Sequence, residues 1–389
     1  MNICRVATVP FFLHHHLREQ VKATLDAGHQ VTLVSSDGLE ASQLKKITGV
    51  KYKQIEISRS ISPWRDLIAL WQLFFYFRKE RFDIIHSVTP KAGFLCAIAG
   101  MFARTPIRLH TFTGQPWMEL HGLLRFVAKT GDWLTAHLNT MIYADSYSQR
   151  NFLIEQNIVA EKRIKVIGRG SIAGVNLTRF NPNLYVSMSQ NVLELLGIHQ
   201  HTNIITFIGR VTKDKGVSEL VEAFIQLNQN KFQCVLLLIG PQEAERDPLP
   251  DNVITSIVEN PRIIEIGYTD CPEKYLAITD ILCLPSYREG FGNVVIEAAA
   301  MGVPTIGTNI VGLRDAIVED VTGLLVPVKN INSLVTALEK LLGNSKLRND
   351  MGKKAMSRAR GEFNSSFVNA LMLTEYNGLA KRNLIDSTI

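Results

Sequence analysis

The pattern best suited to chemistry is a pair of glutamates, Glu289 and Glu297, separated by seven residues. Gly290 and Gly292 follow the first glutamate and precede a helical segment. A glycine turn at a helix N-terminus directs backbone N–H groups at a phosphate, and carboxylates accept hydrogen bonds from sugar hydroxyls. The amides expected to face the phosphate belong to Phe291, Gly292, Asn293 and Val294. The alternative is a capped helix with two solvated acids.

A second polar turn, residues 209–216, follows a predicted strand and precedes a predicted helix. It contains Gly209, Arg210 and Lys215. Two cations facing a diphosphate would neutralise it and stabilise the charge that develops as a sugar–phosphate bond breaks. The residue order differs from that of a P-loop. A solvated basic turn remains the alternative.

Three further candidates lie in the N-terminal half. His110 ends a predicted strand, where a buried core histidine is one interpretation. His86 ends a neighbouring strand and Lys91 begins the next helix. The triplet at 14–16 predicts no metal site, because adjacent histidine side chains diverge. We expect neither a metal nor a cofactor.

Short apolar strands alternate with helices along the whole chain, which is typical of doubly wound α/β domains. The predicted strands of the first half are 3–8, 31–35, 83–87, 107–110, 141–145 and 164–167. Those of the second half are 204–208, 235–239, 263–266, 281–284, 305–307 and 323–327. We therefore expect two Rossmann-like domains, residues 1–182 and 183–369, with a C-terminal helical segment.

Composition narrows the function classes. With 389 residues, of which 46% are hydrophobic and 20% charged, the chain is long enough for two globular domains. Residues 1–182 carry a net charge of +10 and the remainder −4, so the first half favours an anionic partner. No nucleic-acid-binding motif is present, and we expect no nucleic-acid partner. Five scattered cysteines and the lack of a signal-peptide pattern predict a cytoplasmic protein.

Together these segments resemble glycosyltransferase family 4, whose members are retaining enzymes of GT-B architecture. Glu289 and Glu297 match the E-x7-E motif of the family, and Arg210 and Lys215 match its Arg–Lys pair. The resemblance implies two domains facing a central cleft. The N-terminal domain would bind the acceptor and the C-terminal domain the donor, with residues 370–389 packed back onto the N-terminal domain.

The resemblance also implies roles. Glu297 would hold the ribose, Glu289 would contact the transferred sugar, and Arg210 with Lys215 would bind the diphosphate. His110 would be a catalytic residue at the reaction centre, in contact with the donor sugar or a phosphate oxygen. His86 and Lys91 would be candidates for acceptor binding. The expected reaction is a metal-independent, front-face transfer of a hexose or N-acetylhexosamine. One departure is the apolar segment 8–14, which stands where many members have a Gly-Gly loop.

The resembled subgroup builds bacterial capsule, O-antigen or exopolysaccharide. It implies a nucleotide-sugar donor, most often with UDP, and a saccharide acceptor linked to undecaprenyl diphosphate. Two alternatives stay open: a UDP-N-acetylhexosamine 2-epimerase of the same architecture and a non-catalytic nucleotide-sugar binding protein.

The stretch from Trp64 to Phe77 is rich in aromatic residues and is followed by Arg78 and Lys79. Two interpretations account for this composition. The stretch is either a crossover helix buried on its sheet or a surface in contact with an anionic inner membrane. The second interpretation would place the protein peripherally on the cytoplasmic face of that membrane.

Overall fold

The computed structural model describes residues 1–60, 62–229, 232–243 and 247–386, whose contacts divide the chain into two units. Unit 1 contains Met1–Gly174 and the C-terminal residues from Ser365 onward, and unit 2 contains Val175–Asn364. Sequence alone placed the boundary eight residues later. The difference arises because Val175 pairs with Asn364 and is buried in the second core, as is Phe180.

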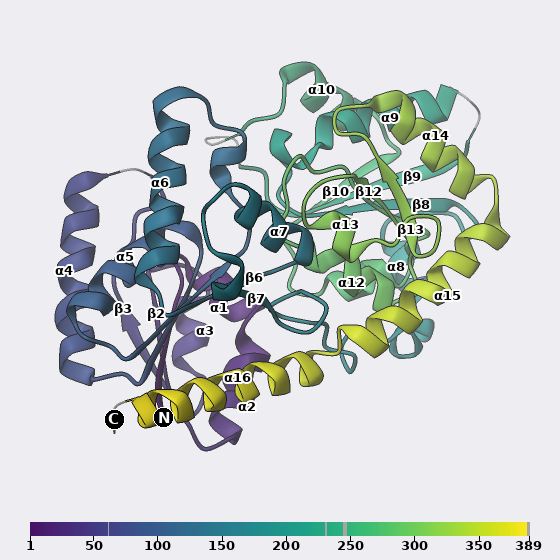
Figure 1. Ribbon diagram of the computed structural model, residues 1–389. Helices are drawn as coiled ribbons and strands as arrows, with labels where there is room; N and C mark the ends of the chain where they lie inside the picture. Colours follow the sequence, from purple (N-terminus) through teal and green to yellow (C-terminus); the bar gives the residue numbers. More distant parts are fainter. Residues whose placement is uncertain (61, 230–231, 244–246, 387–389) are drawn as a thin grey trace. The chain divides into compact units, whose positions relative to one another are not determined.

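Unit 1 is built on a seven-stranded, wholly parallel sheet in the order β3-β2-β1-β4-β5-β6-β7 (Figure 1). The strands are β1 Asn2–Val6, β2 Gln30–Ser35, β3 Val50–Gln54, β4 Ile84–Val88, β5 Ile107–Phe112, β6 Met141–Ala144 and β7 Ile164–Val166. The strand order reverses between β1 and β4, and parallel sheets bind ligands beyond the carboxyl ends of their strands at such a point. Strand β3 was not predicted because, as an edge strand, it exposes most of its residues.

The helices of unit 1 are α1 Pro10–His15, α2 Arg18–Asp26, α3 Ala41–Lys45, α4 Pro63–Glu80, α5 Pro90–Phe102, α6 Gly122–Leu138, α7 Tyr147–Glu155 and α16 Ser365–Asp386. Helix α5 contains several Ala and Gly residues and is buried along most of its length, with α4 and α6 packed against it. Helix α16 buries Met372 and Tyr376 against Ile3 and Tyr143. The apolar segment after β1 forms α1 rather than an open loop.

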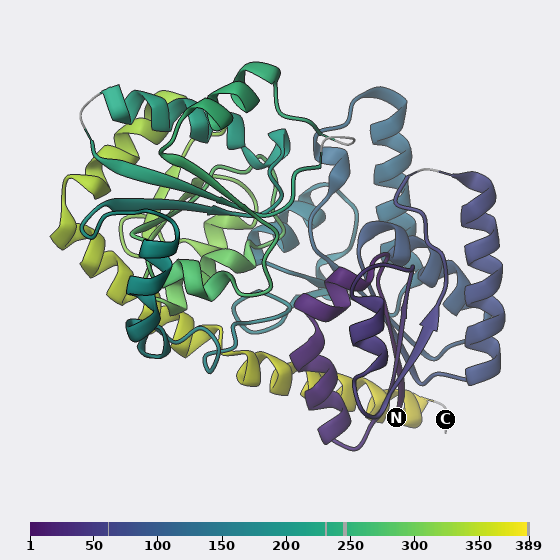
Figure 2. The same cartoon turned by 180° about the vertical axis from the view of Figure 1, so that it is seen from behind.

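Unit 2 has a six-stranded parallel sheet in the order β10-β9-β8-β11-β12-β13, seen from behind in Figure 2. Its strands are β8 Asn203–Ile208, β9 Cys234–Ile239, β10 Ile263–Gly267, β11 Ile281–Leu284, β12 Thr305–Thr308 and β13 Gly323–Val326. Each agrees with its predicted range to within one residue. Its helices are α8 Val186–Leu195, α9 Val217–Gln229, α10 Asp251–Glu259, α11 Pro272–Leu276, α12 Asn293–Ala300, α13 Leu313–Ala316, α14 Ile331–Leu342 and α15 Ser345–Glu362.

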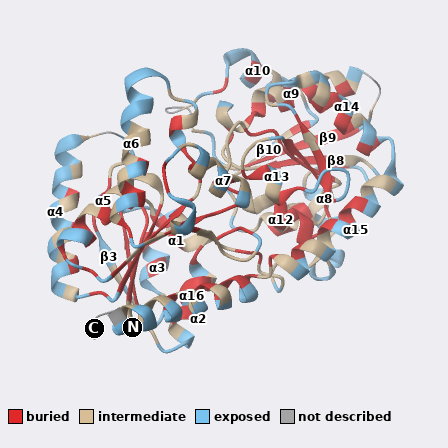
Figure 3. Cartoon of the chain, viewed as in Figure 1, coloured by how far each residue is buried: buried red, intermediate tan, exposed pale blue. Residues whose placement is uncertain are grey.

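Each half is thus a Rossmann-like α/β unit. The central strands of both sheets are buried, as expected for parallel strands covered by helices on both faces (Figure 3). In unit 2 the order reverses between β8 and β11. Pairing of these two strands brings together the turns that follow them, residues 209–216 and 285–292. Those turns carry the main candidates for chemistry.

Candidate active site

An ion pair joins the two turns of unit 2. Lys215 Nζ lies 2.5 Å from Glu289 Oε1, and each side chain is only 15% exposed. Ser286 Oγ donates a second hydrogen bond, of 3.0 Å, to the same oxygen. Two residues that are 74 positions apart therefore meet at the carboxyl edge of the sheet.

Backbone contacts fix the distance between these turns. The N–H of Tyr287 donates to the carbonyl of Asp214 at 2.9 Å. Gly216 has a φ of 71°, and a Cβ there would lie 2.1 Å from the carbonyl oxygen of Pro285. Only glycine permits this approach, and without it Lys215 would not reach Glu289.

Arg210 is held by two carboxylates. Its Nη1 donates to Glu243 at 2.9 Å and its Nη2 to Asp214 at 3.0 Å. Burial opposes ionisation of Asp214, but a hydrogen bond from Thr212 and the nearby cations lower its pKa below the usual value. The guanidinium is therefore oriented by these two carboxylates, one of which belongs to Asp214, the residue directly before Lys215.

Glycines shape the turn before α12. Gly292 is the N-cap, with a φ of 88°, and a Cβ there would lie 2.7 Å from Leu313. Gly312 has a φ of 93°, and a Cβ there would lie 2.6 Å from the carbonyl oxygen of Gly290. The turn is thus packed backbone to backbone, and the first-turn amides of α12, starting at Asn293 and Val294, lie at its end.

Glu297 lies in the second turn of α12, in different surroundings from Glu289. Burial raises its pKa to about 7, while nearby Arg179 lowers it and Glu273 raises it. Arg179 is itself paired with Glu273 at 2.8 Å. In the part of the chain that the structure describes, no hydrogen bond reaches the Glu297 carboxylate. Glu289 is therefore ion-paired, whereas Glu297 is unpaired and, with its raised pKa, partly protonated. The sequence did not predict this difference between the two glutamates.

His110 lies in unit 1, within β5 rather than at its end. Its Nδ1 is 3.0 Å from Ser87 Oγ, and burial lowers its pKa to about 3. The ring is therefore neutral near pH 7. Gly93 in α5 makes room for it, since a Cβ there would lie 2.3 Å from the ring.

His86, a predicted acceptor-binding residue, lies in the core of unit 1, so its role toward an acceptor stays a prediction. The ring is fully buried, Nδ1 accepts from Arg5 at 2.9 Å, and Nε2 lies 2.7 Å from Thr111 Oγ1. Burial and the Arg5 charge lower its pKa well below the usual value, so His86 is a neutral core residue. Its place in a strand facing α16 was not readable from local sequence.

Lys91 begins α5, as predicted, but its side chain is occupied. Its Nζ pairs with Asp66 of α4 at 2.7 Å and donates to the carbonyl of Ser60. It therefore links the first turns of two helices. An acceptor phosphate would have to displace Asp66 to reach it.

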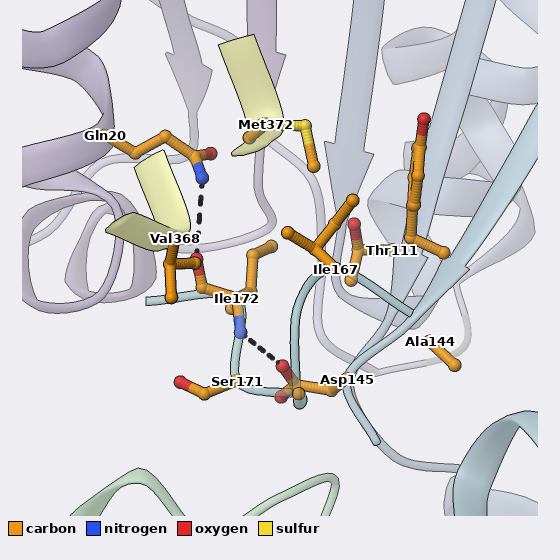
Figure 4. Close-up of a pocket in the computed structure, with 11 residues that line it drawn as sticks. Gln20, Thr111, Ala144, Asp145, Ile167, Ser171, Ile172, Val368 and Met372 are labelled. Carbon is orange, nitrogen blue, oxygen red and sulfur yellow. Dashed lines mark hydrogen bonds between the residues drawn. The ribbon is translucent and has the colours of Figure 1, made fainter. Parts of the chain in front are cut away.

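Sequence reasoning missed a small pocket at the carboxyl edge of the sheet of unit 1 (Figure 4). Asp145 Oδ1 accepts from the N–H of Ile172 at 2.6 Å, and Gln20 donates to the carbonyl of Ile172 at 3.4 Å. Val368 and Met372 of α16 complete the lining. The only sequence signal was the position of Asp145 directly after a strand.

Across the described ranges, no three His, Cys, Asp or Glu side chains are grouped so as to hold a metal ion. None of the helices in the described residues has the length and apolar character required to cross a bilayer.

Both halves match known families. Residues 191–358 match glycosyl transferases group 1, and residues 13–171 match glycosyltransferase family 4. The capsular polysaccharide biosynthesis glycosyltransferase CapM of Staphylococcus aureus is 30% identical, over 94% of each chain. An Escherichia coli UDP-Gal:alpha-D-GlcNAc-diphosphoundecaprenol alpha-1,3-galactosyltransferase is 26% identical, over 79% of this chain and 78% of its own.

A glycosyltransferase structure from Rickettsia africae superposes with a TM-score of 0.79 at 22% identity, over 98% of both chains. The fold is thus that of GT-B enzymes, with one Rossmann-like unit in each half. Because the matches extend through both units and the relative from Staphylococcus aureus covers nearly the whole sequence, this chain belongs to the family 4 glycosyltransferases.

Proposed function

We propose that this glycosyltransferase moves a hexose or N-acetylhexosamine from a UDP-sugar to a saccharide linked to undecaprenyl diphosphate, with retention of configuration. The product would enter a bacterial surface polysaccharide. Support for the substrates comes from the relatives, one of which is named for capsule synthesis and another for a UDP-sugar donor and a diphosphoundecaprenol acceptor. An acceptor of this kind would place the enzyme at the cytoplasmic face of the inner membrane.

The observation that carries the proposal lies at the carboxyl edge between β8 and β11. There Lys215 meets Glu289, and Arg210 of the same turn pairs with Asp214, the residue next to Lys215. Breaking the bond from the anomeric carbon to the diphosphate leaves negative charge on the leaving oxygen. Arg210 and Lys215 would stabilise that charge without a metal. Lys215 would exchange its contact with Glu289 for one with the diphosphate, which frees the Glu289 carboxylate for the sugar hydroxyls.

Glu297 would bind the ribose. With a pKa of about 7, its carboxyl group is protonated in part of the molecules and can accept one hydroxyl hydrogen bond while donating another. His110 is proposed to contact the donor sugar, because its neutral ring retains one nitrogen besides the Nδ1 that faces Ser87. The acceptor hydroxyl would form the new bond to the anomeric carbon on the face that the diphosphate leaves, and a diphosphate oxygen would take its proton.

The test combines binding and turnover. A panel of nucleotide sugars is screened by saturation-transfer NMR, and each binder is then incubated with an undecaprenyl-diphosphate saccharide. Binding of one UDP-sugar in competition with UDP, followed by an α-linked product from an α-linked donor, is expected. Folded protein that binds none of the panel, or a product of inverted configuration, would contradict the proposal. Conversion of UDP-N-acetylglucosamine alone into a second UDP-sugar would identify an epimerase instead.

A further inference from the structure

The outer face of α4 carries large apolar side chains that stay exposed among the described residues of unit 1. Trp64, Trp71 and Phe75 are 77%, 54% and 61% exposed, and Ile68 is exposed between them. Their spacing of four, three and four residues aligns them in one stripe along the helix. The stripe is about 17 Å long at 1.5 Å per residue.

The opposite face of the same helix supplies the core. Ala69, Leu73 and Phe77 are fully buried against α5. Packing of α4 onto its sheet therefore explains the inner face and leaves the outer stripe unexplained. Large aromatic side chains in an exposed row mark a contact surface, because a soluble surface helix is normally polar on that side.

Cations border the stripe. Arg65, Arg78 and Lys79 are exposed on α4, whereas the acid of the first turn, Asp66, is turned toward α5 and paired with Lys91. Unit 1 as a whole holds 24 lysines and arginines against 15 acids, a net charge of +9. Exposed aromatic residues bordered by cations are typical of helices that lie in the headgroup layer of an anionic membrane.

Helix α6 repeats the pattern. Its first turns expose four apolar residues around the exposed Arg125, namely Leu123, Leu124, Phe126 and Val127. Helices α4 and α6 both pack against α5, and the exposed start of α6 and the outer side of α4 are pale blue in Figure 3. Each helix starts downstream of a strand of the same parallel sheet, so both begin at its carboxyl edge.

We propose that the outer face of α4 and the first turns of α6, together called the lipid-facing surface, bind the surface of a bilayer containing anionic lipids. The inference rests on the proposed function, since a lipid-linked acceptor would then be delivered to the carboxyl edge of the sheet that holds β5. The helices would lie on the bilayer surface rather than cross it, because α4 carries five charged residues, namely Arg65, Asp66, Arg78, Lys79 and Glu80.

The charges favour a membrane over a second copy of the chain. In a two-fold dimer the same surface meets itself, so the α4 cations would face their own copies. Anionic lipid headgroups instead neutralise them. Aromatic rings also prefer the boundary between headgroups and acyl chains.

The experiment is sedimentation of the full chain with vesicles of pure phosphatidylcholine or of phosphatidylcholine with 40% phosphatidylglycerol. Binding to the anionic vesicles, weakened by salt, is expected. Trp71→Ser with Phe75→Ser should lower the partition coefficient roughly tenfold or more. Arg78→Glu with Lys79→Glu should lower it roughly 25-fold or more, because each cation contributes about a factor of five.

Matched controls lie on unit 2. Leu195→Ser with Val258→Ser removes exposed apolar residues, and Lys353→Glu with Lys354→Glu reverses exposed cations. Both should bind vesicles like the original chain. Quenching of tryptophan fluorescence by brominated lipids should be lost when Trp64 and Trp71 are replaced.

Absence of binding to the anionic vesicles, or equal binding by the α4 variants, would overturn the proposal. So would a dimer in solution that dissociates in the Trp71→Ser, Phe75→Ser variant, since that would make the face a subunit interface. UDP binding is measured on the same proteins without vesicles. A protein that binds UDP but no vesicles would refute only the proposal of a lipid-facing surface. A protein that binds vesicles but no donor would refute the proposed function.

Discussion

Replacing Lys215 with methionine separates a catalytic role of the Lys215–Glu289 pair from a structural one. The change removes the cation that lies 2.5 Å from Glu289 and keeps most of the side-chain volume. Glu289 retains its hydrogen bond from Ser286 but loses its charge partner in a site that is 15% exposed. An unpaired buried acceptor costs about 1–3 kcal/mol, so we expect the free energy of unfolding to fall by about that amount.

The catalytic effect should be larger and of different origin. A donor group that stabilises charge in the transition state contributes about 2.7–4 kcal/mol, so kcat should fall by about 10²–10³. Adding Glu289→Gln to Lys215→Met removes the unpaired charge and should recover most of the lost stability. It should not recover kcat, because the cation for the leaving diphosphate is still missing.

The assay is urea unfolding together with initial rates of sugar transfer for both variants. Lys340→Met is the control: its pair with Asp320 spans 3.0 Å, but the side chains are 48% and 65% exposed, so stability and rate should be unchanged. A single variant with kcat within threefold of the original, or a double variant that regains kcat, would refute the assignment of Lys215 to catalysis.

Three other predictions are tested independently. Since burial raises the folded pKa of Glu297 to about 7, the folded state holds an extra proton between pH 4.5 and 7. The free energy of unfolding should therefore fall as pH rises through that window. Glu297→Gln should flatten this pH dependence in urea unfolding and should weaken UDP binding. An unchanged pH dependence and an unchanged UDP affinity would contradict both points. Gly93→Ala should destabilise unit 1 by about 1–3 kcal/mol by forcing His110 to move, whereas Gly131→Ala in α6, with open space around it, should not; equal melting temperatures would contradict the packing argument. Transfer rates should be the same with and without EDTA, because two cations are proposed to bind the diphosphate, and a loss restored by magnesium would show otherwise.

The sequence by itself determined the two α/β units and the residues most suited to chemistry. Alternating apolar strands and helices are local patterns, so the strands of unit 2 were predicted to within one residue. The spacing of Glu289 and Glu297 and the composition of residues 209–216 are local as well. They led to the family that the comparisons then showed.

Only the tertiary structure decided what each side chain contacts. Lys215 meets Glu289 because β8 pairs with β11, and no local pattern encodes which strands are neighbours. His86 is enclosed in the core because α16, far along the chain, places Tyr376 beside it. Contacts between distant segments depend on the order of strands in the sheet, which sequence periodicity does not carry.

The aromatic stretch from Trp64 to Phe77 shows the same division. Sequence left a core helix and a membrane surface as alternatives, whereas the structure divides the residues between two faces of α4. Phe77 belongs to the core and Trp71 to the exposed stripe. Which face is buried depends on how α4 packs against α5, and that packing is set by the fold rather than by the apolar content of the helix.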